Sequence, residues 1–188
     1  MDAARLNIYT VNDIEALPEG QRAELIDGFW YDMASPNPTH QEIISNLSYA
    51  LTDYIKKHHG KCQVFPAPFA VYLQKDNRNY LEPDIVVLCD KDKLSKRGCE
   101  GAPDLVIEVT SESTQRRDYG VKLFKYRNSG VREYWIVNPD VRTVNTFEFP
   151  DSLKDDEAGE QHSFNEEIAF ALYPDLTVKL DDMITWTS

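Results

Sequence analysis

Apolar positions along the chain recur at helical spacing in two segments and at strand spacing in several shorter ones. The clearest helix follows Asn37, which can cap it, and Pro38, which suits its first turn, and it is stopped by Gly60. The apolar side of this helix is formed by Ile44, Leu47, Leu51 and Ile55. A second helix is expected over residues 113–128. Each helix has a side that must be covered by the rest of the fold.

Segments rich in β-branched and apolar residues predict the strands, at 63–73, 81–88, 104–110, 132–137 and 143–149. The dipeptide Asp27-Gly28 separates two short strand-like runs and predicts a β-hairpin with a type I′ turn. The C-terminal residues supply two or three further short strands. The order helix, three strands, helix, strand therefore predicts an α/β core with an N-terminal β-hairpin and a C-terminal β extension. At 188 residues, the simplest organisation is a single domain over residues 1–188.

Two of the predicted strands each contain a carboxylate in an otherwise apolar run, Asp84 in the first and Glu108 in the second. Side chains alternate along a strand, so Glu108 and Thr110 share one face. A carboxylate in a buried strand is unfavourable unless a hydrogen bond, a cation or a metal compensates for its lost hydration. Two such carboxylates on neighbouring strands could hold a divalent ion. The pattern thus predicts the site of a metal-dependent hydrolase.

Composition narrows the class of protein. The chain is 41% hydrophobic, which is typical of a folded domain, and no apolar run approaches the roughly 18–20 residues that a membrane span requires. We expect no membrane partner, and a cytoplasmic location because the N-terminus has no signal pattern. The three cysteines, Cys62, Cys89 and Cys99, are scattered and lack a C-x-x-C spacing. They predict neither a disulfide framework nor a zinc site.

The formal net charge of −12 bears on the choice of partner. Nucleic-acid-binding proteins usually carry a basic surface, because neutralising phosphates dominates their affinity. Local basic clusters occur at residues 56–61, 91–97 and 116–117. The overall charge weakens the case for DNA as a partner without removing it.

The ordered motifs of the chain resemble those of the Uma family of candidate restriction endonucleases, within the PD-(D/E)XK nuclease superfamily. The resemblance covers residues from about 10 to 180 and is carried by segments 23–28, 38–40, 82–87, 103–111, 113–114, 118–126 and 130–139. It implies a restriction-endonuclease-like core, in which a mixed central sheet is flanked by helices.

The resemblance assigns roles to individual positions. Asp84 and Glu108 match the two metal-binding carboxylates of the superfamily, and the backbone carbonyl of Val109 is expected to complete the metal site. The superfamily usually has a lysine two residues after the glutamate, but this chain has Thr110 there. Threonine cannot supply the positive charge of that lysine. The family pattern moves the lysine onto the following helix, which points to Lys122.

Helix geometry bears on Lys122 independently of the resemblance. Asp118, Lys122 and Lys125 occupy one narrow polar stripe of a helix that is otherwise apolar, because positions three and four apart lie on one face. The stripe is either a solvated surface with a weak Asp118–Lys122 pair or a row of side chains that enters the site. Lys122 is expected to direct its ammonium toward Glu108 in the second case, and Lys125 is the alternative.

Three further residues are accessory candidates with open interpretations. His40, at the start of the first long helix, either caps and packs or orients a metal-bound water. Glu24 is either a surface residue of the hairpin or an additional carboxylate of the site. Asp118 lies four residues before Lys122 on the same stripe, and Thr110, at the usual lysine position, is a further accessory candidate.

Two hypotheses follow for function. The first is an endonuclease that uses Mg²⁺ or Mn²⁺ to hydrolyse phosphodiester bonds of nucleic acid, DNA in the first instance, with Lys122 stabilising the charge of the transition state. A homodimer is expected, since cutting a duplex usually requires two sites and residues 143–149 and 168–174 offer apolar strand surface. The second is a catalytically inactive binding or regulatory module with the same fold.

Overall fold

The computed structural model describes residues 8–73, 76–149 and 159–185. Its centre is a six-stranded mixed sheet in the order β11-β10-β9-β8-β5-β3. The strands are β3 (Gln63–Pro66), β5 (Ile85–Leu88), β8 (Leu105–Val109), β9 (Glu133–Asn138), β10 (Thr143–Glu148) and β11 (Glu160–Ser163). β8 and β9 are parallel, and the other neighbours are antiparallel. No helix in the described part of the chain is long and apolar enough to cross a membrane.

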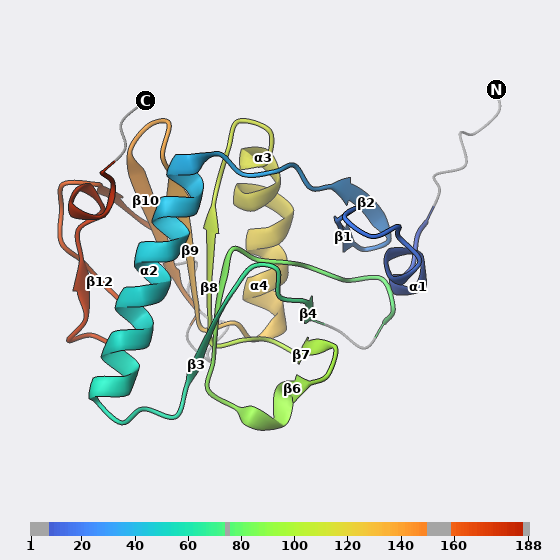
Figure 1. The fold of residues 1–188 in the computed structure, drawn as a ribbon, viewed down its shortest axis with the longest axis horizontal. Coiled ribbons are helices and arrows are strands. Elements are labelled where there is room, and N and C mark those ends of the chain that lie inside the picture. Colours follow the sequence, from blue (N-terminus) through green and yellow to red (C-terminus); the bar gives the residue numbers. More distant parts are fainter. Residues whose placement is uncertain (1–7, 74–75, 150–158, 186–188) are drawn as a thin grey trace.

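Helices cover both faces of this sheet (Figure 1). α2 (Pro38–Lys57) packs on one face, where its apolar side joins Ile85 and Val87 in the larger core. Val86 and Leu88, which point the other way along the same strand, belong to a second core with Tyr126 of the opposite helical layer. Successive side chains of β5 therefore enter the two cores in turn, one core on each face of the sheet. This explains why the segment is continuously hydrophobic. The predicted mixed α/β architecture is confirmed.

The helical layer opposite α2 connects the parallel strands β8 and β9. It consists of α3 (Gln115–Arg117), a π-helical turn η2 (Asp118–Lys122) and α4 (Leu123–Ser129), and it ends at Gly130 in a left-handed conformation with φ of 95°. The sequence predicts one regular helix here, and the structure inserts a wider turn. Such π turns occur frequently at functional sites.

The N-terminal elements match their sequence signals. α1 (Val11–Glu15) has a capping box between Thr10 and Asp13. β1 (Ala23–Ile26) and β2 (Phe29–Asp32) form the predicted hairpin, and Asp27 and Gly28 have φ of 52° and 83°, as a type I′ turn requires.

The smaller strands were only partly predicted. The strand expected over residues 63–73 is divided, because Pro66 and Pro68 lack backbone N–H donors for a continuous ladder. Its second part, β4, joins a three-stranded sheet in the order β4-β7-β6 that the sequence analysis missed. The remaining elements are β4 (Val71–Tyr72), η1 (Lys91–Lys93), β6 (Leu94–Ser95), β7 (Gly98–Glu100), β12 (Ile168–Ala169), β13 (Thr177–Val178) and η3 (Leu180–Met183).

The C-terminal extension packs against the sheet of its own chain. Ile168, Phe170 and Val178 are buried in the larger core, and the Phe170 ring stacks on Trp135 with centroids 4.2 Å apart. β10 is paired on both sides. The apolar strand surface that was expected to support a homodimer is therefore already covered, and dimerisation itself stays a prediction.

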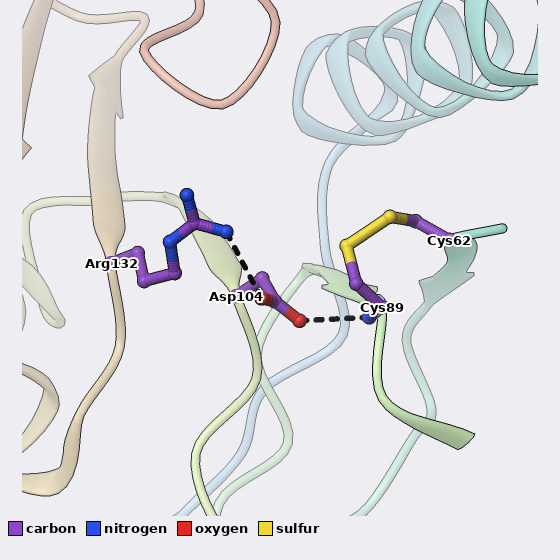
Figure 2. Close-up of a disulfide and its surroundings, with 4 residues drawn as sticks. All are labelled: Cys62, Cys89, Asp104 and Arg132. Atoms are coloured by element: carbon purple, nitrogen blue, oxygen red, sulfur yellow. Dashed lines mark hydrogen bonds and ion pairs between the residues drawn. A yellow bond between two sulfur atoms is a disulfide. The ribbon is translucent and has the colours of Figure 1, made fainter. Parts of the chain in front are cut away.

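The expectation that the scattered cysteines form no disulfide framework was wrong for one pair. Cys62 and Cys89 form a disulfide (Figure 2). Cys99 is a buried free thiol. The antiparallel register of β3 and β5 pairs Gln63 with Leu88, so the next step brings the two cysteines opposite each other. Spacing along the chain gave no indication of this pairing, because it depends on the register between two strands.

Beside the disulfide, Asp104 links two segments of chain. One oxygen of its carboxylate accepts a hydrogen bond of 2.8 Å from the backbone N–H of Cys89, and the other pairs with Arg132 at 3.4 Å (Figure 2).

Candidate active site

The two predicted carboxylates lie on neighbouring strands, as expected. β5 pairs with β8 so that Ile85 faces Ile107, and one further step in this register places Asp84 opposite Glu108. Asp84 directly precedes β5, and its side chain lines the same cavity as Glu108. One oxygen of Asp84 also accepts a hydrogen bond of 2.7 Å from the backbone N–H of Val109. This bond fixes the first carboxylate against the strand that carries the second.

The ammonium of Lys122 points toward Glu108, which confirms the geometric expectation. Its Nζ lies 2.8 Å from Oε1 of Glu108, 2.8 Å from Oε1 of Glu24 and 3.7 Å from Oδ1 of Asp118. The π turn carries both Asp118 and Lys122 inward, and the Lys122 side chain is only 3% exposed. The polar stripe is thus not a solvated surface at these positions. Lys125, the alternative, pairs instead with Asp27 of the hairpin turn.

Glu24 belongs to the site, which decides between its two interpretations. It is 1% exposed, and its Oε1 also accepts a hydrogen bond of 3.2 Å from the backbone N–H of Glu82. Glu24, on strand β1 of the hairpin, therefore contacts the same Lys122 ammonium that contacts Glu108 of the central sheet.

Burial controls the protonation of this cluster. Burial raises the pKa of Glu108, and Lys122 opposes this rise, whereas the neighbouring carboxylates of Asp118 and Glu24 add to it. For Lys122, burial lowers the pKa, but the surrounding carboxylates outweigh burial and raise it. Lys122 therefore stays protonated.

Tyr126 is a member of the cluster that the sequence analysis did not assign. Its hydroxyl donates a hydrogen bond of 2.9 Å to Oε1 of Glu108, the same oxygen that Lys122 contacts. Burial raises the pKa of this phenol, so that it remains a hydrogen-bond donor. Its spacing of four residues from Lys122 is the one feature that indicates the position.

His40 contacts the first carboxylate. Its Nε2 lies 3.3 Å from Oδ2 of Asp84, and its backbone N–H is capped by the side chain of Asn37 at 2.8 Å. Burial lowers the pKa of His40, but the hydrogen bond and charge of Asp84 oppose burial, and the net effect is a raised pKa. The backbone of His40 thus takes part in the cap of α2, and its imidazole contacts Asp84 in the site.

Thr110 takes no part in the cluster of charges. It is buried, and its hydroxyl lies 3.1 Å from that of Thr114 at the start of the helical layer. Thr110, at the position where a lysine is usual, therefore contacts another hydroxyl group and no charged side chain of the cluster.

These residues surround a cavity of about 410 Å³. Among the described residues that line it, the carboxylates outnumber the cations six to three. The carboxylates are Glu24, Asp32, Glu82, Asp84, Glu108 and Asp118, and the cations, His40 aside, are Arg22, Arg117 and Lys122. Arg22 and Arg117 were not predicted, because arginines in a polar context give no pattern that separates them from surface residues.

The family of the chain follows from a family model that matches residues 11–181 and is described as "Uma2: Putative restriction endonuclease". The chain belongs to the Uma2 family. The resemblance noted from the motifs is thereby confirmed. Uma2 membership also agrees with the observation that several of the motifs, widely separated in the sequence, contribute residues to one cavity.

Two comparisons place this Uma2 chain among known proteins. It is 28% identical over 119 residues to the uncharacterised protein slr1290 of Synechocystis sp., and the match covers 63% of this chain and 61% of that protein. The fold is similar to the crystal structure of a putative nuclease from Anabaena variabilis ATCC 29413, with a TM-score of 0.73 and 18% identity over 93% of this chain and 96% of that one.

The oxygen donors of the Uma2 site fit a hard divalent cation. Within the described residues, no three His, Cys, Asp or Glu side chains are grouped as metal ligands. A cation here would depend on Asp84, Glu108, the Val109 carbonyl and water, and Mg²⁺ commonly binds with one or two carboxylates while it keeps several waters. Oδ1 of Asp118 is also buried without a hydrogen-bond partner. The proposed ligands are all oxygen atoms, which hard divalent cations prefer.

Proposed function

We propose that this Uma2-family chain is a metal-dependent endonuclease that hydrolyses phosphodiester bonds of nucleic acid. The observation that carries the proposal is the buried ammonium of Lys122 in contact with Glu108, next to a second strand carboxylate at Asp84. A surface lysine would not be held at 3% exposure between carboxylates from three different elements.

In this proposal, Asp84, Glu108 and the carbonyl of Val109 would hold Mg²⁺ or Mn²⁺. When bound, the cation would lower the pKa of a coordinated water and neutralise charge on the scissile phosphate. Lys122 and Tyr126 each donate a hydrogen bond to the same oxygen of Glu108 and thereby hold this carboxyl group in a fixed orientation. The charge of Lys122 also stabilises the additional negative charge of the transition state.

The charge of the cavity explains why such an enzyme would need the cation. Carboxylates outnumber cations among the described lining residues, and a polyanion approaching them would be repelled. A divalent ion at Asp84 and Glu108 would offset the charge of the two carboxylates that hold it and so weaken this repulsion. Nucleic acid, DNA in the first instance, is the proposed substrate, and a two-fold dimer would supply the second site that cutting a duplex requires.

Cleavage assays on DNA and RNA, each with Mg²⁺, Mn²⁺ and EDTA, test the proposal. The wild type should cut in the presence of a metal, and Asp84→Asn and Glu108→Gln should lose at least 100-fold in rate. Asp53→Asn, which changes a half-exposed carboxylate on α2 away from the cavity, is the matched control and should cut normally. A wild type that cuts neither substrate with either metal would refute the proposal.

A catalytically inactive binding or regulatory module is the second candidate. Thr110 at the usual lysine position and the acidic lining of the cavity favour it. The cleavage assays distinguish the two candidates: an inactive module cuts no nucleic acid under the same conditions, whether or not calorimetry shows binding of Mg²⁺ or Mn²⁺.

A further inference from the structure

A second group of side chains in the cavity has no role in the mechanism above. Ser111, Ser113 and Arg117 line the same cavity as Glu108 but stand on the segment that leads from β8 into the helical layer. Their donor groups are those that proteins commonly use to contact phosphate oxygens. We refer to these three residues as the Arg117 subsite.

The Arg117 guanidinium is held in place but is paired only loosely with a carboxylate. Its central carbon lies 4.9 Å from the centre of the Tyr31 ring, which holds the side chain against strand β2. Its Nε is 3.6 Å from Oε2 of Glu24, yet this buried nitrogen has no hydrogen-bond partner. A buried donor without an acceptor is unfavourable and requires an explanation. A ligand that completes the site provides one.

The other two cations of the cavity are already paired. Lys122 has carboxylate oxygens at 2.8 Å on two sides, and Arg22 donates to Glu82 at 2.7 Å. Among the described residues that line the cavity, Arg117 is thus the cation whose charge is least committed to a carboxylate. It is 14% exposed, against 3% for Lys122, so a ligand in the cavity can reach it.

The serine hydroxyls add donors next to this cation. The hydroxyls of Ser111 and Ser113 lie 3.1 Å apart, and one hydrogen bond between them uses only one of their two protons. Ser111 Oγ is also 3.4 Å from Thr114 Oγ1, so its proton can turn either to Thr114 or to the cavity. A cation and rotatable hydroxyls on one wall match the oxygens of a phosphate group.

We propose that the Arg117 subsite binds a phosphodiester of the nucleic-acid strand next to the one that is cleaved, and thereby sets the position of the strand. This inference rests on the proposed nuclease function. Arg117 supplies binding and alignment, whereas Asp84, Glu108 and Lys122 surround the reacting group. A guanidinium fork with two parallel N–H donors suits a phosphate better than a lysine ammonium does.

The first test does not require catalysis. Inorganic phosphate is titrated into ¹⁵N-labelled protein in EDTA, and the Nε–H resonance of Arg117 is followed by NMR, with Arg116 as the exposed internal control. We expect a saturable shift for Arg117 and none for Arg116. No shift at 100-fold excess of phosphate would overturn the subsite, whether or not the protein cleaves nucleic acid.

The second test measures cleavage of a single-stranded oligonucleotide by the wild type and by Arg117→Gln, Arg117→Lys and Arg116→Gln. Arg117→Gln should raise KM at least 10-fold with less than a 3-fold change in kcat, and Arg117→Lys should fall between it and the wild type. Arg116→Gln removes the same charge from an exposed position and should behave as the wild type. An unchanged KM for Arg117→Gln in an active enzyme would overturn the inference and leave the nuclease function standing. A phosphate shift at Arg117 in a protein that cuts nothing would retain the subsite and refute the nuclease.

Discussion

Replacing Lys122 with Met should destabilise the fold, in contrast to what the sequence suggests. If Lys122 belonged to a solvated stripe, its removal would cost little stability, because exposed ion pairs contribute only about 0–1 kcal/mol. In the structure, Lys122 is the ammonium shared by Glu24, Glu108 and Asp118, whose side chains are 1%, 6% and 3% exposed. Removing one partner of a buried ion pair leaves uncompensated charge and typically costs about 3–5 kcal/mol. We expect a loss of this size in the free energy of unfolding.

Urea unfolding followed by the fluorescence of the buried Trp135 measures this loss. Lys57→Met is the matched control, because Lys57 also has an aspartate four residues away but is 71% exposed, and it should unfold like the wild type. The variant Lys122→Met/Glu24→Gln should recover part of the loss, since one of the buried charges is removed with its partner. A Lys122→Met variant within 1 kcal/mol of the wild type would refute the buried cluster.

Three further predictions concern stability. Reducing the Cys62–Cys89 disulfide, which closes a loop with a sequence separation of 27, should cost about 3 kcal/mol, and a Cys62→Ser/Cys89→Ser variant should be insensitive to reductant. Tyr126→Phe should cost about 2 kcal/mol in urea unfolding by removing the hydrogen bond to Glu108, and a loss near zero would contradict that bond. Burial raises the pKa of Glu133, although hydrogen bonds from Leu172, Ala171 and Trp135 oppose this rise. The contribution of Glu133 to stability should therefore be full below its unfolded pKa and fall as the pH rises through its folded pKa. The stability of Glu133→Gln relative to the wild type should therefore increase as the pH rises above the unfolded pKa of glutamate, and parallel pH profiles would contradict this.

The sequence predicts those features that depend on local pattern. The capping box of Thr10, the type I′ turn at Asp27-Gly28 and the helix after Asn37 each rest on a few neighbouring residues. The opposition of Asp84 and Glu108 was also accessible, because two adjacent apolar strands with one carboxylate each have few arrangements that avoid burying isolated charge.

Features that depend on register or on distant contacts were not accessible. The disulfide exists because β3 and β5 pair with Gln63 opposite Leu88, and no residue spacing encodes that register. The burial of Glu24 depends on how the hairpin docks, and the π turn at Asp118–Lys122 leaves no mark in an ordinary helical pattern. The burial of Phe170 likewise depends on the tail folding back onto Trp135.

The displaced lysine changes how the site is held together. A lysine at position 110 would share a strand and a face with Glu108, and its contacts would be set within the sheet alone. Lys122 instead approaches from the helical layer, and the π turn brings its ammonium to Glu108 of the sheet and to Glu24 of the hairpin at the same distance of 2.8 Å. One cation therefore joins three separate elements. The position of the hairpin and the orientation of the carboxylates therefore depend on each other through Lys122. A substitution that loosens the hairpin should disturb the carboxylates even when it contacts none of them.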